Sequence, residues 1–163
     1  CIKKISNSFA TNYSFDCYCV YKNILFLVNI KVQKERSANN AIAAINRLYK
    51  DYVKSSIENI SAEKSYLILK THYSFAKSKA DNERKISIKG TDCYALEEID
   101  FSKGILKDHR NWSKTFNENS GRLQIPKQWL INRRLQDSEI SYSKTKEFLT
   151  NIYNGTYNQK EQQ

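Results

Sequence analysis

Three polar side chains near the N-terminus have the types and the spacing of a small hydrolytic site. Asn29 and Lys31 interrupt the apolar run Ile24 to Val32, and Asp16 lies a short distance before that run. Carboxylate and amide oxygens are ligands that Mg²⁺ accepts in proteins. A Lys amine beside a bound metal can orient a water molecule or lower its pKa. The three residues therefore predict a small metal and water site.

A β-hairpin would have to position these side chains. The segment Tyr13 to Val32 is predicted to form two strands that are joined at Lys22-Asn23. With a two-residue turn, Tyr21 pairs with Ile24, and counting back along both strands pairs Asp16 with Asn29. Since side chains alternate between the two faces of a strand, Lys31 shares a face with Asn29. The register thus predicts one face that carries all three residues.

The segments that follow predict the rest of a sheet. A helix with Ser37 as its N-cap is expected over 38–57, with one apolar and one basic face. A strand over 66–75 would then be a parallel neighbour of the hairpin, reached by a crossover. Further strands are expected at 85–89, 93–99 and 123–125, with a turn at 90–92. Helices are expected at 127–135, after Pro126, and at 141–153, ending before Gly155.

The charge of the chain favours a polyanionic partner. Its 27 Lys and Arg residues exceed its 17 Asp and Glu residues and give a net charge of +10. Such an excess favours nucleic acid through counterion release, although an anionic membrane surface or simple solubility would also account for it. No apolar run approaches the roughly 20 residues that cross a bilayer. Cys17 and Cys19 are expected to be buried thiols in a reducing cytoplasm.

Asp16, followed by Asn29-Ile30-Lys31 on the next strand, resembles the PD-(D/E)xK nuclease superfamily, and type II restriction endonucleases most nearly. The similarity covers about residues 13–75, which are the hairpin, the following helix and the next strand. It implies that Asp16 and Asn29 bind Mg²⁺ together with the Ile30 carbonyl, and that Lys31 positions or activates the attacking water. This chain departs from the family in having Asn29 where an acid is usual, Phe15 where Pro is usual, and no acid before Asp16.

The resemblance also implies a fold, a substrate and partners. The expected fold is α/β (α+β) and restriction-endonuclease-like: a central mixed sheet with a catalytic hairpin, a crossover helix and C-terminal helices. The expected partner is double-stranded DNA, and a homodimer is common in this family. The helix, strand and Glu that usually precede the Asp would come from a missing N-terminal segment or a partner chain. We place a single domain at 1–155, with a core at about 13–100, a DNA-recognition segment at about 101–135 and a flexible tail at 156–163.

Basic and amide side chains supply the expected contacts to DNA. Arg can bind guanine in a bidentate way, and Asn and Gln can bind adenine similarly. They come from the basic face of the expected helix and from the segment KDHRNWSK with its continuation, although that segment could equally be a surface loop that Trp112 pins to the core. The candidate residues are Arg36, Asn39, Asn40, Arg47, Lys107, His109, Arg110, Asn111, Trp112, Lys114, Arg122 and Gln124.

Other interpretations are open. Asp16 and Asn29 could form an ordinary polar pair across a half-exposed sheet, with Lys31 as a solvated strand end. The chain could also be a non-catalytic nucleic-acid-binding domain, that is, a degenerate nuclease, or an interaction protein with an incidental basic surface. Asp108-His109 invites comparison with HNH nucleases, but no His follows His109 to complete their metal site.

Overall fold

The computed structural model describes residues 2–4, 13–35, 40–54, 63–77, 84–101, 122–132 and 140–157. Within these ranges, five strands form one mixed sheet in the order β1-β2-β3-β5-β6, and two short strands form a second sheet, β4-β7. The strands of the large sheet are β1 (Ile2–Lys4), β2 (Cys17–Tyr21), β3 (Ile24–Lys34), β5 (Glu63–Lys77) and β6 (Arg84–Ala95). The fold is therefore a mixed α/β arrangement around a central mixed sheet, as the sequence predicts.

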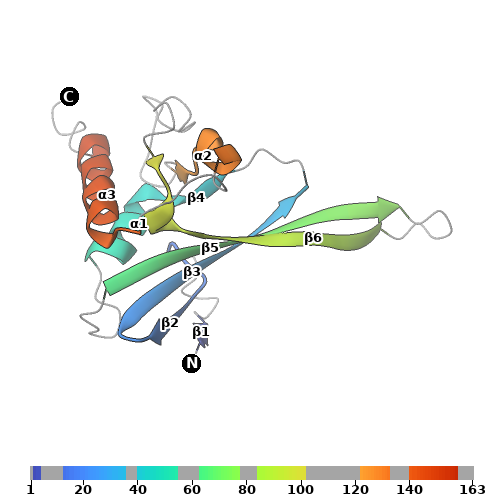
Figure 1. Cartoon of the computed structure of the whole chain (residues 1–163), viewed down its shortest axis with the longest axis horizontal. Coiled ribbons are helices and arrows are strands. Elements are labelled where there is room, and N and C mark those ends of the chain that lie inside the picture. The colour runs from blue at the N-terminus through green and yellow to red at the C-terminus, as the bar shows by residue number, and fades with distance from the viewer. Residues whose placement is uncertain are drawn as a thin grey trace.

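The large sheet is covered on one face. Along β3, Leu25, Leu27 and Asn29 are buried, while the residues between them are partly exposed. Figure 1 shows the helices and the small sheet gathered on one side of the large sheet, with the outer ends of β5 and β6 reaching beyond them. Apolar side chains from all of these layers form the core: Leu25, Leu27, Ile42, Ile45, Leu48, Tyr52, Tyr66, Ile68, Leu96, Leu123, Trp129 and Leu149.

The hairpin β2–β3 has the predicted turn and register. Lys22 and Asn23 have φ values of 46° and 62°, as the two central residues of a type I′ turn require. Tyr21 pairs with Ile24, and the ladder continues in step to Cys17 and Val28. The two-residue turn and the counted pairing are therefore confirmed as far as Cys17 and Val28, but the predicted pairing of Asp16 with Asn29 is not part of the ladder. The first strand is shorter than predicted, since Tyr13 to Asp16 precede β2 instead of belonging to it.

The predicted crossover to a parallel strand is confirmed, but the predicted extent of its helix, 38–57, is wrong. β5 pairs with β3 in parallel along the whole of β3, from Ile24 opposite Glu63 to Lys34 opposite Tyr73. Between them, Ala41–Ala44 form β4, α1 spans only Ile45–Tyr49, and Lys50–Lys54 form a π-helical turn. Ala41–Ala44 become a strand because β7 (Arg122–Gln124) pairs with them. The predicted N-cap, Ser37, lies outside the described residues, and Ala44 holds the N-cap position of α1.

β6 is one strand where two were predicted. Residues 84–95 pair continuously with β5, so the expected turn at Gly90-Thr91-Asp92 is wrong. The register shifts by one residue between His72 and Tyr73, because His72 pairs with Gly90 and Tyr73 pairs with Ile88. Gly90 thus marks a β-bulge, which is another place where glycine commonly interrupts a strand pattern.

The C-terminal elements begin where the sequence predicts. α2 (Lys127–Asn132) follows Pro126, and α3 (Tyr142–Tyr157) follows Ser141. α3 continues past Gly155, which we expected to follow its end. Stacked rings fix α3 on the core, with ring centroids 4.0 Å apart for Tyr49 and Tyr153.

A buried carboxylate ties the covered face of the sheet to the helices. Glu97 is 7% exposed, and its Oε1 accepts hydrogen bonds from the Tyr52 hydroxyl at 2.7 Å and from the Tyr66 backbone N–H at 2.9 Å. Ser65 Oγ lies 3.3 Å from the other carboxylate oxygen. Burial raises the pKa of this carboxyl group above its ordinary value. Glu97 is therefore a structural acid inside the fold.

Candidate active site

Asp16 sits where the chain leaves the hairpin ladder. Its backbone N–H donates to the Val28 carbonyl at 2.8 Å, and its Oδ2 accepts from the Ile30 N–H at 2.6 Å. The regular pairing ends one pair earlier, at Cys17 and Val28, so Asp16 does not stand squarely opposite Asn29. It flanks Asn29 instead, with one bond to the residue before it and one to the residue after it. The carboxylate is held against β3 by backbone geometry.

Asn29 is buried and fixed by its amide nitrogen. The residue is 2% exposed, and Nδ2 lies 2.7 Å from the Ser14 carbonyl, 3.1 Å from the Ile42 carbonyl and 2.8 Å from the Tyr66 hydroxyl. The two carbonyl oxygens can only accept, so the nitrogen must face them. Oδ1 is left buried without a hydrogen-bond partner among the described residues. The interpretation of Asn29 as half of an exposed polar pair is therefore wrong.

Further hydrogen bonds hold the segment before β2 in place. The Tyr66 hydroxyl also donates to the Ser14 carbonyl. The Ser14 N–H donates to Asp51 Oδ2 at 2.6 Å, and Lys64 Nζ donates to the Asp51 carbonyl at 3.0 Å. Asp51 is 1% exposed, and burial raises the pKa of its carboxyl group. Sequence reasoning missed Ser14, Asp51 and Tyr66. Tyr66 could have been found once β5 is placed beside β3, because it falls on the same face as Asn29.

Lys31 shares the covered face with Asn29, as predicted. It is half-buried, and burial lowers the pKa of its amine below the ordinary value. The Asp16 carboxylate acts in the opposite direction, while Arg122 lowers the pKa further. A solvated strand end is therefore a wrong description of Lys31. Burial therefore makes this amine easier to deprotonate than that of an exposed Lys, and the neutral form can accept a proton or a hydrogen bond.

These residues line one pocket of about 320 Å³, which we call the Asp16 pocket. Two arginines join them: Arg47 from α1 and Arg122 from β7. Among the described residues that line the pocket, Asp16 is the one carboxylate, against the three cations Lys31, Arg47 and Arg122. Such a cluster favours an anion that carries several oxygen atoms, because each Arg can hold two of them.

The remaining predicted contacts divide into two groups. Asn40 and Gln124 are described and lie near the small sheet, where Gln124 pairs with Ala41 and Asn40 Oδ1 accepts from Lys70 Nζ at 3.2 Å. The others lie outside the described residues: Arg36, Asn39, Lys107, His109, Arg110, Asn111, Trp112 and Lys114.

The oxygen atoms of the Asp16 pocket fit a Mg²⁺ ion as ligands. The Ile30 N–H bonds to Asp16 Oδ2 and not to Oδ1, Asn29 Oδ1 is a buried acceptor without a partner among the described residues, and both residues line the same pocket. The N–H and C=O of one strand residue point to the same side, so the Ile30 carbonyl faces the side from which Asp16 approaches. Mg²⁺ is commonly held by one carboxylate and a few further oxygens and retains several waters. No cluster of three or more His, Cys, Asp or Glu residues suited to a metal occurs in the described ranges.

Comparison of the sequence with models of known protein families and with curated proteins finds no match. In the part of the chain that the structure describes, no helix is long and apolar enough to span a membrane. Cys17 and Cys19, expected to be buried, are half-buried free thiols.

Proposed function

We propose that this chain is a Mg²⁺-dependent endonuclease that hydrolyses double-stranded DNA at the Asp16 pocket, with a restriction-endonuclease-like fold. The observation that carries the proposal is the convergence of Asp16, Asn29 and Lys31 with two arginines in a single pocket. The surrounding architecture supports it, because an antiparallel hairpin followed by a crossover to a parallel strand is the arrangement that the resemblance implies.

Each residue of the pocket has a role that follows from its chemistry. The Asp16 carboxylate, Asn29 Oδ1 and the Ile30 carbonyl would hold Mg²⁺, which when bound neutralises phosphate charge and acidifies water. Arg47 and Arg122 would grip the non-bridging oxygens of the phosphate. Lys31, whose amine pKa is lowered by burial, would hold the attacking water and receive a hydrogen bond or proton from it.

A second function is favoured by a different observation. Asp16 Oδ2 is already bound to a backbone N–H, and the amide nitrogen of Asn29 is tied to two carbonyls and a hydroxyl. Both side chains therefore also serve the fold, in a pocket with a single acid and three cations. A degenerate nuclease that binds DNA without cutting it would keep this arrangement.

Cleavage of supercoiled plasmid DNA, with Mg²⁺ or with a chelator, separates the two functions. The nuclease proposal predicts Mg²⁺-dependent nicking or linearisation, abolished by Asp16→Ala and lowered about 10²- to 10⁴-fold by Lys31→Gln. Lys144→Gln, which removes the same charge from the exposed surface of α3, is the matched control and should cut normally. Salt-sensitive binding without any cleavage would favour the degenerate nuclease, and cleavage that survives Lys31→Gln unchanged would refute the assigned site.

A further inference from the structure

A second hollow of about 270 Å³ adjoins the Asp16 pocket. The two share Lys31 and Ala41 in their walls. The second is also lined by Asn40 and by Lys70, and we call it the lysine pocket. Lys70 comes from β5, on the covered face of the sheet, and sequence reasoning assigned it no function. The chain thus has two hollows side by side with one amine between them.

Two lysines stand directly opposite each other in this wall. The parallel register pairs Lys31 of β3 with Lys70 of β5, and neighbouring strands are about 4.8 Å apart. Like charges in directly opposed positions destabilise a sheet. Lys70 is only 6% exposed. The register therefore places two amines in directly opposed positions on the covered face, where an anion between them would offset their repulsion.

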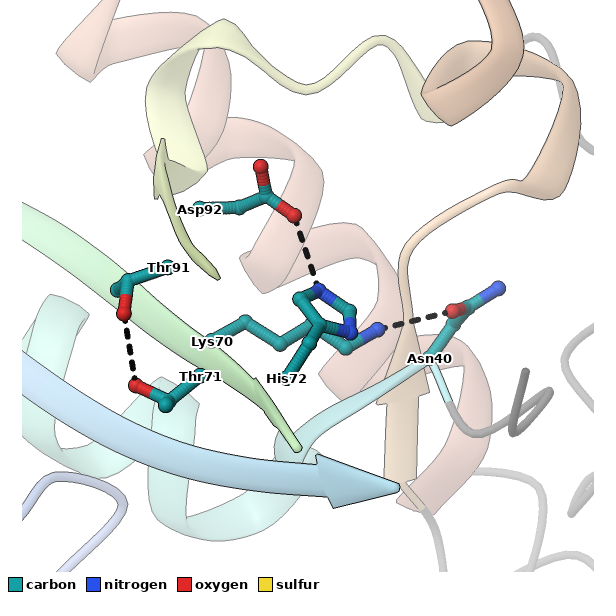
Figure 2. A network of polar contacts seen from close by, with 6 residues as sticks. All are labelled: Asn40, Lys70, Thr71, His72, Thr91 and Asp92. Carbon is teal, nitrogen blue, oxygen red and sulfur yellow. Dashed lines mark hydrogen bonds and ion pairs between the residues drawn. The ribbon is translucent and has the colours of Figure 1, made fainter. Parts of the chain in front are cut away.

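The nearby carboxylates of Asp16 and Asp92 offset part of this charge, but no acid is among the described residues that line the lysine pocket. Figure 2 shows Lys70 Nζ held by Asn40 Oδ1, a neutral amide, at 3.2 Å. Asp92 of β6 stands opposite Lys70 and partly offsets its charge, but Asp92 Oδ2 is bound to His72 Nε2 at 3.0 Å (Figure 2). On the other side of Lys31, the Asp16 carboxylate accepts from the Ile30 N–H and offsets part of the Lys31 charge. A hollow that is lined by Lys31, Lys34 and Lys70, with no acid among its described lining residues, suits an anion.

We propose that the lysine pocket binds a phosphate group between Lys31 and Lys70. Resting on the proposed nuclease function, this phosphate would be the one next to the phosphate in the Asp16 pocket, on the same DNA strand. Since Lys31 borders both hollows, a strand with one phosphate in the Asp16 pocket can place a neighbouring phosphate in the lysine pocket. Lys70 would then hold the DNA backbone near the outer part of β5. It is a binding residue and does not contact the reacting atoms.

DNA binding in an Asp16→Ala background tests the pocket without cleavage. Lys70→Gln should lower the slope of log K against log salt by about 1 and weaken binding equally for unrelated sequences. At about 0.1 M salt this corresponds to a loss of about eightfold, because each phosphate contact scales with salt to a power of about −0.9. Asn40→Asp is a second variant, nearly isosteric, which sets a carboxylate beside the Lys70 amine and should have the same effect. Lys144→Gln is the control and should leave the slope of the Asp16→Ala protein unchanged.

Thermal unfolding in the presence of inorganic phosphate tests the lysine pocket independently of the nuclease proposal. A ligand that binds only the folded state raises the unfolding temperature. Millimolar phosphate should therefore stabilise the wild-type and Lys144→Gln proteins more than an equal ionic strength of chloride. It should stabilise Lys70→Gln and Asn40→Asp less, because only the Asp16 pocket of these variants is left to hold phosphate. Equal stabilisation of Lys70→Gln, or an unchanged DNA salt slope, would overturn the lysine pocket. If the wild-type protein binds no DNA but keeps the phosphate effect, the nuclease proposal fails and the pocket stands.

Discussion

Replacing Asn29 with Asp should destabilise the protein strongly, although it restores the acid that is usual in the nuclease motif. The Asn29 amide nitrogen lies within 3.1 Å of two backbone carbonyls, those of Ser14 and Ile42. A carboxylate has no hydrogen to donate, so Asn29→Asp would set a buried negative charge against both oxygens. We expect a loss of about 3–5 kcal/mol in the free energy of unfolding, which is typical of an uncompensated buried charge.

The magnitude can also be built from the individual bonds. Removing the donors leaves the Ile42 carbonyl and the carboxylate itself unsatisfied on this side, at about 1–3 kcal/mol for each buried group. The Ser14 carbonyl keeps its bond from the Tyr66 hydroxyl, which limits the loss there. Protonation of the introduced acid would restore one donor, so its pKa should be raised in the folded state. The variant should then recover part of its stability as the pH falls toward that pKa.

Urea denaturation at several pH values measures this effect. Asn46→Asp is the matched control, because Asn46 uses its Oδ1 to accept from the Arg47 N–H at 2.7 Å, and a carboxylate can accept the same bond. The control should differ from wild type by no more than about 0.5 kcal/mol. If Asn29→Asp is also within that margin at neutral pH, the assigned amide orientation is incorrect. Asn29 would then be free to act as a simple replacement for an acid.

Two further substitutions test the buried charges. Lys31→Met should abolish cleavage, but it should leave the free energy of unfolding within about 0.5 kcal/mol of wild type or above it. The reason is that an apolar chain of similar length replaces a half-buried amine opposite Lys70. A large loss of stability in urea denaturation would contradict this prediction. Glu97→Gln should gain stability relative to wild type as the pH rises from about 4 to about 8. Burial raises the pKa of the Glu97 carboxyl group, so the stability that it lends when protonated is lost as the pH passes through that raised value. A constant difference between the two proteins in thermal unfolding across that range would refute the assignment.

The parts of the fold that were predictable are those that depend on neighbours in sequence. The hairpin followed from one turn and from alternation, since Lys22 and Asn23 adopt the conformations that a two-residue turn needs. The strand Ala41–Ala44 could not be predicted in this way, because its partner is β7, which lies far along the chain. Ile42 and Ile45 have a spacing that suits a helix as well, and only the tertiary pairing decides between the two. At Gly90 the same residue type serves a turn or a bulge, and here β5 selects the bulge.

The candidate site was predictable to a similar degree. Asp16, Asn29 and Lys31 come from one hairpin, so a local register could bring them to one pocket. Tyr66 and Lys70 come from β5, and their alignment with β3 depends on how far the parallel strand is staggered. Sequence alone gives no stagger for a parallel pair, because no tight turn connects the two strands. Tyr66 and Lys70 therefore become predictable only once the position of β5 against β3 is known.

The amide of Asn29 also bears on how this protein reaches its folded state. It joins β3 to the segment before β2, to β4 and to β5, and its partners Ser14 and Tyr66 are bonded to each other across 52 residues of chain. Closing such long loops costs entropy before any contact repays it, which makes parallel pairings slow to form. The hairpin can form early, but a chain that has folded only this far has neither the Asp16 pocket nor the lysine pocket. We therefore expect any activity of this chain to emerge with the last cooperative step of folding, and not with its first strands.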